Sequence, residues 1–295
     1  MTFMEFTEKF PTEKKVIAYF IKIRYQGGIA CNHCGSTKVY HRQDNLKFFQ
    51  CNDCNNSFSI FKDTIFEKTT TDLRKWMYAI HLFLNGKKGI SGLQLKRETG
   101  VTYKTAWRML NRIRKAMGNV INRDMFEAII EMDETYVGGK PRKGNKDRDN
   151  NNKRGRGTKK TPVVGIIDRN KKKIFAKVAM PNKNGKKLTG MQLLSILNEI
   201  CKQDSAIITD EFTGYNILSK TNHVRLTIDH SIEFAHGMIH TNNVESFWAT
   251  LKRGVYGIYH HVSVKYLQDY VNEFCFRYNN RKVNMFDLVL KQTII

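Results

Sequence analysis

The stretch CNHCGSTKVYHRQDNLKFFQCNDCNNSFSI, residues 31–60, carries two Cys-x2-Cys pairs separated by sixteen residues. Each pair is followed by a residue that tolerates the tight backbone around a tetrahedral metal, Gly35 after the first pair and Asn55 after the second. This spacing is typical of a structural zinc site with four thiolate ligands. We therefore predict a zinc ribbon with short β-strands over about residues 29–62, and its predicted ligands are Cys31, Cys34, Cys51 and Cys54.

Two disulfides are the alternative use of these four cysteines. No signal peptide precedes them, and the other two cysteines, Cys201 and Cys275, are scattered through the chain. Disulfides belong to oxidising compartments, so the absence of a secretory signal favours zinc and a reducing, cytoplasmic setting. The metal allows a small segment to fold, but it does not by itself tell what the protein does.

The chain is strongly basic. Its 295 residues include 50 Lys and Arg against 27 Asp and Glu, a net charge of +23 that is spread along the whole sequence. A surplus of this size indicates a polyanionic partner, and nucleic acid is the first candidate. Membrane binding is disfavoured, because no apolar run approaches the length of a spanning helix and no lipidation motif is present.

Composition and periodicity divide the chain into three predicted domains of overall α/β class, at residues 1–66, 67–120 and 121–295. The first holds the ribbon, preceded by an amphipathic helix over Pro11–Tyr25 with Thr12 as its N-cap. The second is helical from Asp72 onward.

Within the second domain, residues 91–114 predict a helix-turn-helix, with the turn at Gly100 and Thr102 as the N-cap of the second helix. A plain helical hairpin with a solvated basic face is the alternative. We favour DNA contact, because the cationic face has no compensating acids. The residues predicted to face outward are Tyr103, Lys104, Arg108, Arg112 and Arg114; those predicted to face inward are Ala106, Trp107, Leu110 and Ile113.

The sequence of the third domain predicts a mixed arrangement of strands and helices. A tract of Gly, Asn, Lys and Arg over 138–160 is too polar to pack, so we interpret it as a loop that adds nonspecific phosphate contacts. The predicted strands are 126–132, 162–168, 173–180, 206–209 and 224–228, and the predicted helices are 188–201, 242–252 and 264–281.

Two acids of this domain share one context. Asp133 follows the apolar strand 126–132, and Asp210 follows the apolar strand 206–209. An acid at the carboxyl end of a buried strand stands at the edge of the sheet, where sites usually form. Two such carboxylates brought close together repel each other and call for cations, and hard divalent ions such as Mg²⁺ or Mn²⁺ suit oxygen ligands.

A third acid lies on the predicted helix 240–253. Asn242, Glu245 and Lys252 share one face of it because they are spaced by three and seven residues. Taken singly, the acids could be caps or turn residues, and Glu245 with Lys252 could be a surface ion pair. The side chains expected to bury the other side of this helix are Phe247, Trp248 and Leu251.

Three acids with a lysine suit phosphoryl transfer. Two metal ions held about 3.5–4 Å apart can clamp an in-line displacement at phosphorus. The acids would hold the ions, and Lys252 would steady the phosphate. All three acids together with the net charge favour this site over the separate structural explanations.

With these motifs the chain resembles a known family, the bacterial insertion-sequence transposases of the DDE class. Within that class it resembles the branch with an N-terminal zinc ribbon and an ISXO-like catalytic domain. The resemblance covers nearly the whole chain and is loose only in the basic loop and around 186–201. The stretches that carry it are FPTEKKVIAYFIKIRYQGGIACNHCGS, FQCNDCNNSFSI, MDETYVGGK, DEFTGY and HTNNVESFWATLKRGVYGIYHHVSVKYLQDYVNEFCFRYNNR.

The resemblance implies an RNase H-like catalytic domain and metal-dependent cleavage and joining of DNA strands at element ends. Asp133, Asp210 and Glu245 take the places of the first, second and third acids, and Lys252 that of the trailing basic residue. Asn242 competes with Glu245, because relatives differ at the third position; a carboxylate is the stronger ligand for a hard ion.

The implied partners are double-stranded DNA, both the terminal inverted repeats of the element and the target, and a second copy of the chain, as a homodimer or higher oligomer on DNA. The implied ions are structural Zn²⁺ and catalytic Mg²⁺ or Mn²⁺, and the implied location is the bacterial cytoplasm, at the nucleoid. The residues expected to contact DNA are Lys104, Arg108, Arg112 and Arg253.

Two other function classes stay open on the sequence. A zinc-ribbon transcription regulator would explain the charge and the cysteines, but it leaves Asp133, Asp210 and Glu245 without a role. A structure-specific nuclease would use the acids but would cut DNA without joining it. Metal-dependent nicking separates the first alternative from a transposase, and strand-transfer products separate the second.

Overall fold

The computed structural model describes residues 1–118, 125–138, 160–180, 188–228 and 237–293. The chain forms two compact units. The first unit consists of Met1–Val120 together with Lys282–Ile295, and the second consists of Ile121–Arg281.

Two short helices open the first unit. Helix α1 (Phe3–Lys9) begins with a capping box, in which Thr2 and Glu5 each bind the other's backbone N–H. Helix α2 (Glu13–Arg24) begins at Thr12, whose hydroxyl accepts a hydrogen bond from the backbone N–H of Lys15. The sequence predicted α2 and its cap, which are confirmed, but it did not predict α1.

The ribbon is a three-stranded antiparallel sheet in the order β1 (Val39–His41), β2 (Phe48–Cys51) and β3 (Ser57–Ser59). Its strands are too short to bury much apolar surface, and Phe49 and Phe58 form a stacked pair inside it. Such a small sheet needs a further stabilising element, and the four cysteines occupy the position where a metal can supply it.

Three helices follow the ribbon: α3 (Leu73–Asn85), α4 (Gly92–Thr99) and α5 (Tyr103–Gly118). Gly100 lies between the last two with φ 68°, a left-handed conformation that glycine adopts without strain. The predicted helix-turn-helix and its turn residue are therefore confirmed.

The orientation predicted for two side chains of α5 is wrong. Arg114, expected to face outward, is 1% exposed, and its guanidinium lies over the ring of Phe83 at 5.1 Å. Trp107, expected to face inward, is 37% exposed. Position 114 lies one turn after the core residue Leu110, so it falls at the edge of the buried stripe, where an arginine can lay its stem against apolar neighbours.

The last helix of the chain, α9 (Met285–Gln292), belongs to the first unit. It packs against α2, α3 and α5, and the backbone N–H of Ile65 donates to the carbonyl of Thr293. The predicted catalytic domain, which ran to residue 295, is wrong for this final segment. The predicted division at residues 66 and 67 stays a prediction.

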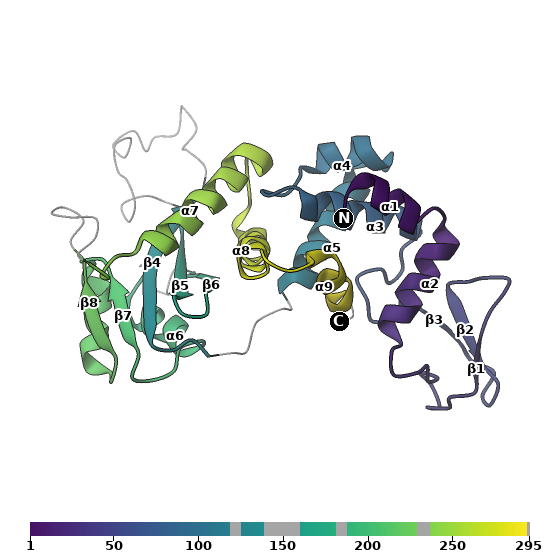
Figure 1. Ribbon diagram of the computed structural model, residues 1–295, viewed down its shortest axis with the longest axis horizontal. Helices are drawn as coiled ribbons and strands as arrows, with labels where there is room; N and C mark the ends of the chain where they lie inside the picture. The colour runs from purple at the N-terminus through teal and green to yellow at the C-terminus, as the bar shows by residue number, and fades with distance from the viewer. Residues whose placement is uncertain (119–124, 139–159, 181–187, 229–236, 294–295) are drawn as a thin grey trace. The chain divides into compact units, whose positions relative to one another are not determined.

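The second unit contains a five-stranded sheet in the order β6-β5-β4-β7-β8 (Figure 1). The first three strands are antiparallel neighbours, and β7 and β8 continue the sheet in parallel with β4. This is the RNase H-like arrangement. The strands are β4 (Ile129–Val137), β5 (Thr161–Asp168), β6 (Lys173–Val178), β7 (Ala206–Thr209) and β8 (Val224–Thr227).

Helices cover both faces of this sheet and form two apolar cores. One core joins the sheet to α6 (Gly190–Asn198) and the 3-10 helix η3 (Thr213–Lys220). The other joins it to α7 (Asn242–Gly254) and α8 (Val264–Asn279). A π-helical turn, η4 (Val255–Tyr259), extends α7. The central strands β4, β5 and β7 are largely buried between the two helical layers, which explains their nearly unbroken apolar runs in the sequence, whereas the edge strand β8 is partly exposed.

Strand β4 differs from the prediction. It was expected to end before Asp133, but it runs on to Val137 and pairs with β5 along that whole length. The polar side chains of its second half find partners inside the unit, so they do not end the strand. The expected loop over 138–160 lies outside the described residues, except for its two ends.

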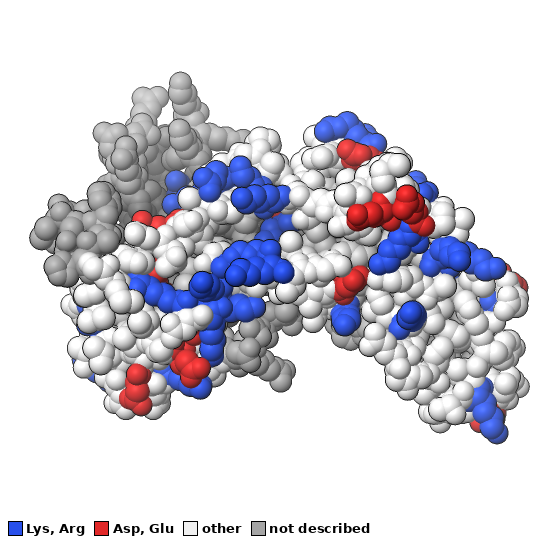
Figure 2. Space-filling view, in the orientation of Figure 1, with Lys and Arg blue, Asp and Glu red and all other residues white. Residues whose placement is uncertain are grey.

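Lys and Arg side chains are spread over the visible face of each unit, with fewer Asp and Glu among them (Figure 2). In the part of the chain that the structure describes, none of the helices is both long and apolar enough to cross a membrane.

Candidate zinc ribbon and carboxylate site

The four ribbon cysteines converge on one point. The sulfur atoms of Cys31 and Cys54 are 3.6 Å apart, as are those of Cys34 and Cys51. A tetrahedral zinc ion with Zn–S bonds of about 2.3 Å would separate its sulfurs by about 3.8 Å, whereas a disulfide needs about 2.05 Å. All four thiols are free. The donor set and its spacing therefore fit a zinc ion and not two disulfides.

The backbone favours a thiolate at one of these cysteines. The N–H groups of Cys34 and His33 point at the sulfur of Cys31 and lower its pKa to about 6. The hydrogen bond from His33 to this sulfur is 3.4 Å long. Because zinc binds thiolates, this arrangement prepares the ribbon for the metal.

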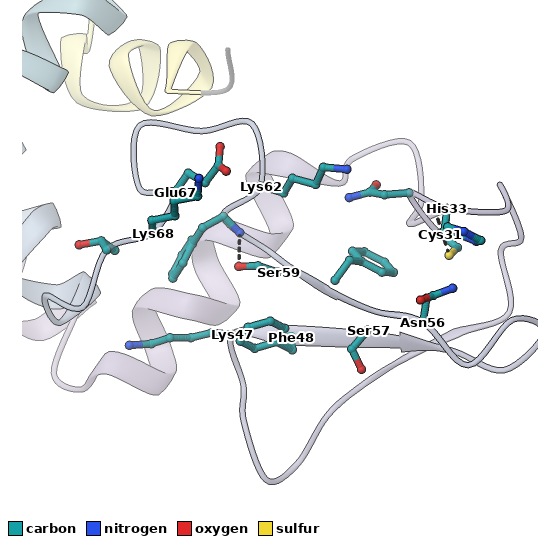
Figure 3. Close-up of a pocket in the computed structure, with 14 residues that line it drawn as sticks. Cys31, His33, Lys47, Phe48, Asn56, Ser57, Ser59, Lys62, Glu67 and Lys68 are labelled. Carbon is teal, nitrogen blue, oxygen red and sulfur yellow. Dashed lines mark hydrogen bonds between the residues drawn. The ribbon is translucent and has the colours of Figure 1, made fainter.

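A groove of about 530 Å³ lies beside the ribbon (Figure 3). It is bounded by the segment Cys31 to His33, by strands β2 and β3, and by the segment that carries Lys62 and Lys68. Lys47 also lines it, but its ammonium group pairs with Glu13 at 2.8 Å. The groove is lined by aromatic rings, among them Phe48 and Phe58, as well as by lysine side chains, and it lies within the first unit.

The two predicted aspartates meet on neighbouring strands. Asp133 lies in the middle of β4, and Asp210 directly follows β7. The parallel register pairs Glu131 with Ile208, so Asp210 comes level with Asp133 two residues further on. Carboxylate oxygens of Asp133, Glu134 and Asp210 all lie within 4.8 Å of one another.

A network of hydrogen bonds fixes the backbone around Asp210. Its own carboxylate accepts the backbone N–H of Phe212 at 3.0 Å, which forms a tight turn. Arg225, on β8, donates to the hydroxyl of Thr209 and to the carbonyl of Asp210, both at 3.0 Å. These contacts hold the end of β7 in place, so the direction of the Asp210 side chain is set by the sheet.

Helix α7 reaches the other aspartate through an indole. Nε1 of Trp248 donates to Oδ2 of Asp133 at 3.0 Å. The ring packs over Gly165, the residue of β5 that pairs with Asp133. A Cβ atom on Gly165 would lie only 2.6 Å from the indole, so the absence of a side chain there lets the helix come this close.

Burial, and after it the negative charges of Glu134 and Asp210, raise the pKa of Asp133 to about 8. The hydrogen bond from Trp248 acts in the opposite direction and is too weak to offset these effects. Carboxyl groups held together in this way repel one another when ionised. A divalent cation relieves that repulsion, and an all-oxygen donor set fits Mg²⁺ or Mn²⁺.

Glu134 is a member of the cluster that the sequence did not single out. Its side chain accepts a hydrogen bond from the hydroxyl of Tyr215 at 2.8 Å. Tyr215 is fully buried, and burial with the charge of Glu134 raises its pKa well above the usual range, so it acts only as a donor. The motif Asp133-Glu134 could have indicated this role, because two adjacent acids at a sheet edge cost free energy to bury unless each has a hydrogen-bond partner or a cation.

The predicted third acid is placed differently. Glu245 is exposed on the first turn of α7, and the hydroxyl of Thr241 donates to its carboxylate at 2.9 Å. In the described part of the chain, the group of acids within 4.8 Å contains Glu134 and does not contain Glu245. Its competitor, Asn242, is also exposed, at the start of the same helix.

Lys252, in the last turn of α7, is half-buried. Burial lowers its pKa, while the nearby charge of Asp133 acts to raise it. Trp248 and Lys252 are four residues apart, so they share one face of α7, and both sense Asp133. The prediction that Phe247, Trp248 and Leu251 bury the other side of this helix is confirmed. The indole N–H of Trp248 in addition points at the acid, which the sequence did not predict.

The four predicted DNA contacts fall into two groups. Lys104, Arg108 and Arg253 are exposed. Arg112 is half-buried, and its guanidinium donates to the carbonyl oxygens of Ile65 and Glu67 at 2.5 and 3.0 Å. Arg112 thus holds the segment after the ribbon, a role that the sequence did not indicate.

Family models match both units. The model of the ISXO2-like transposase domain matches residues 125–279, and that of the transposase zinc-ribbon domain matches residues 11–57. A protein of Halobacterium salinarum described as an uncharacterized protein in transposable element ISH50 is 28% identical over 267 residues, covering 83% of this chain and 86% of its own length. An uncharacterized transposase-like protein of Haemophilus influenzae is 29% identical over 102 residues, covering 35% of this chain and 82% of its own length.

Two solved structures are similar at lower levels. One is a chain of the simian T-cell lymphotropic virus intasome in complex with the PP2A regulatory subunit B56 gamma, at 15% identity and a TM-score of 0.29. The match covers 69% of this chain and 63% of that one. The other, a pre-cleavage Mos1 transpososome, has 10% identity and a TM-score of 0.28, with 74% and 77% covered. At such scores the fold assignment depends on the strand order and not on these likenesses.

Proposed function

Because the chain belongs to the family of ISXO2-like transposases, we propose that it cleaves a phosphodiester bond at each end of an insertion sequence and joins the freed 3′-hydroxyl to target DNA. The observation that carries the proposal is the meeting of Asp133 and Asp210 on parallel neighbouring strands, level with each other beneath α7. A DNA-binding regulator has no use for this arrangement.

Asp133, Asp210 and Glu134 would hold the divalent ions, and Glu245 or Asn242 would complete the site once DNA and metal are bound. When bound, two ions activate the attacking oxygen and stabilise the leaving oxygen of an in-line displacement. In the cleavage step a water oxygen would bond to phosphorus and the 3′-oxygen would leave; in the joining step that 3′-oxygen would bond to phosphorus of the target and a target-strand oxygen would leave. Each step replaces one P–O bond by another, so no high-energy cofactor is required. The separation of Glu245 from the other acids supports a rearrangement of the Glu245 side chain on binding.

The surrounding residues would prepare the site for a phosphate. Lys252 stands on the same face of α7 as Trp248 and can pair with a phosphate oxygen, where a positive charge lowers the cost of charge developing in the transition state. The indole of Trp248 keeps Asp133 turned toward the cluster. Arg225 and the turn at Phe212 do the same for Asp210.

DNA recognition would use the first unit. The exposed face of α5, with Lys104 and Arg108, suits a recognition helix in the major groove. The lysines Lys62 and Lys68, which line the groove beside the ribbon, suit phosphate contacts that fix the register on the duplex. Arg253, at the end of α7, would contact DNA near the carboxylates.

Pairing two element ends needs at least two active sites, so we propose that the chain works as a homodimer or higher oligomer on DNA, in the bacterial cytoplasm. The division of the chain into ribbon, helix-turn-helix and catalytic domains would separate end recognition from chemistry. Helix α9 returns to the first unit and would link the two functions.

Strand transfer by the purified protein tests the proposal. The substrates are labelled duplexes that end in the termini of the element and a target plasmid, with Mg²⁺ or Mn²⁺. We expect joined products, and we expect Asp210→Ala to reduce them by about 10³-fold or more. Glu199→Ala is the control, because Glu199 is a surface acid of the same unit that pairs with Lys177.

The possible outcomes separate the alternatives. Joined products that persist at the wild-type level in Asp210→Ala would contradict the proposed site. Metal-dependent cutting without joining would identify a nuclease. DNA binding without metal-dependent chemistry would identify a regulator or an inactive copy.

A further inference from the structure

Glu131 is a buried acid that neither the motifs nor the carboxylate cluster accounts for. It lies on β4 two residues before Asp133 and is 0% exposed. One of its carboxylate oxygens accepts the backbone N–H groups of Asn243 and Val244 at 3.0 and 3.1 Å. The other accepts Nδ2 of Asn243 and Nε of Arg169, both at 2.6 Å. Four donors from two other segments thus meet on one side chain.

These contacts make Glu131 the cap of α7. The first N–H groups of a helix have no partner within the helix, and an acceptor at this end also interacts favourably with the helix dipole. The residue that precedes α7, Thr241, makes no side-chain capping bond. A carboxylate from the sheet supplies the acceptor instead, so the cap ties the helix to β4.

Arg169 extends the same connection. Besides Glu131, its guanidinium donates to Nδ1 and to the carbonyl oxygen of His240, at 2.9 and 2.6 Å, and to the carbonyl of Met238. Arg169 directly follows β5. One arginine and one glutamate therefore join the ends of two strands to the segment that leads into α7.

The spacing of the contacts fixes the helix along its axis. Glu131 and Asp133 are two residues apart on one face of β4, a rise of about 6.6 Å. Their partners on α7, Val244 and Trp248, are four residues apart, a rise of about 6 Å along a helix. The two spacings agree, so the cap at one end and the indole at the other hold α7 in a single register on the strand.

We propose that Glu131 is a positioning residue that sets the register of α7 and thereby the place of Glu245 and Lys252 relative to Asp133 and Asp210. This inference rests on the proposed function. It explains why a charge is retained in the core: an apolar residue of similar size could stabilise the fold as well, but it could not bind two directed N–H groups at the start of a helix.

The test compares Glu131→Gln with Glu273→Gln in the full-length protein. Glu273 is the matched control, since it is also fully buried and is bound by Arg277 at 3.0 Å and by the hydroxyl of Tyr259 at 2.9 Å, but it lies on α8. Two properties are measured for each protein: the affinity for Mn²⁺ alone by calorimetry, and the metal concentration that gives half-maximal DNA cleavage. Thermal unfolding reports the stability of each variant.

We expect both variants to lose stability, and only Glu131→Gln to weaken Mn²⁺ binding and raise the half-maximal metal concentration, by about 10- to 100-fold. Equal Mn²⁺ affinities in the two variants would overturn the inference and leave Glu131 a structural residue. If Glu131→Gln does not fold, Glu131→Asp, which keeps the charge on a shorter side chain, takes its place with the same criterion.

Failure of the proposed function is visible separately. A wild-type protein that binds Mn²⁺ but neither cuts nor joins DNA would overturn the transposase proposal, while the Mn²⁺ affinities still decide the role of Glu131. A wild-type protein that binds no Mn²⁺ would overturn both.

Discussion

The ribbon and the carboxylate site bring their ligands together in opposite ways. The four thiols come from 24 consecutive residues, Cys31 to Cys54, whereas Asp133 and Asp210 are 77 positions apart and meet through the order of strands in a sheet. The ribbon has little core of its own, and the sheet has an apolar core on each face. A metal ion is therefore part of the fold in the first case and an addition to a finished fold in the second.

This difference decides what each metal would stabilise. Removing zinc from the ribbon removes the main interaction that holds three short strands. Removing a divalent ion from the carboxylates leaves a folded sheet with acids that repel one another, and the raised pKa of Asp133 shows that the fold tolerates this by binding a proton.

The largest effect should therefore follow zinc removal. A strong chelator, or Cys51→Ser, should unfold the ribbon, because structural zinc contributes on the order of 10–16 kcal/mol in small domains. Hydrogen exchange should show loss of protection in β1 to β3 and unchanged protection in β4 to β8.

Cys275→Ser is the control for that experiment, because it removes a thiol of the second unit and should leave the zinc content at one ion per chain. A ribbon that stays protected from hydrogen exchange without zinc would contradict the view that the metal is part of its fold, since its apolar residues would then be enough to keep it folded.

The second prediction concerns the packing of α7 on the sheet. Gly165→Ala would place a methyl group 2.6 Å from the indole of Trp248 and 3.1 Å from Val244. We expect the helix to shift, with a loss of about 1–3 kcal/mol in unfolding free energy. Because Glu245 and Lys252 move with it, DNA cleavage should fall by about 10²-fold.

Gly257→Ala is the matched control, since nothing lies within 4 Å of a Cβ atom placed there. Thermal unfolding and a cleavage assay measure both variants. Full cleavage activity in Gly165→Ala would show that the position of α7 is set by the substrate and not by the sheet.

The same difference explains what the sequence could predict. The ribbon could be read from spacing alone, and the apolar strands before Asp133 and Asp210 located both acids. Glu131 was missed although it carried a signal, since a charge inside the apolar run 126–132 must find a partner if it is buried. Its partners are N–H groups of a helix 112 residues away. This pairing depends on how the helix packs on the sheet, and a local sequence pattern cannot predict it.

The errors on α5 and α9 have the same origin. Arg114 was predicted to lie on the surface because periodicity does not show which helix covers the edge of an apolar stripe. In the structure Phe83 of α3 covers that edge. Helix α9 follows the catalytic domain in sequence but completes the core of the first unit. Local structure was predictable in both cases, and the long-range packing was not.

The third prediction uses the pKa of Asp133, which burial and neighbouring acids raise to about 8 in the absence of metal. Below that pH the carboxyl group holds a proton that a divalent ion must displace. Apparent Mn²⁺ affinity should therefore rise with pH, by up to about tenfold per unit, and level off above pH 8. Calorimetry from pH 6 to 9 measures it.

Asp133→Asn is the control for the pH dependence, since it removes the titrating group; its weaker Mn²⁺ binding should vary much less with pH. A wild-type affinity that is constant from pH 6 to 8 would contradict the prediction. It would mean that the carboxylates of the cluster are already ionised below pH 8, and that the fold tolerates their negative charges without binding a proton.

The smallest effect distinguishes two arginines of one helix in the first unit. Arg108 is exposed, so Arg108→Ala should weaken DNA binding a few-fold, lower the slope of log affinity against log salt by about 1 and leave stability within about 0.5 kcal/mol. Arg112 binds the carbonyls of Ile65 and Glu67, so Arg112→Ala should lower stability by about 1–3 kcal/mol. Salt titrations and thermal unfolding give both quantities. Equal salt slopes for the two variants would mean that Arg112 leaves its carbonyl partners to meet phosphate, and that the segment after the ribbon rearranges on DNA.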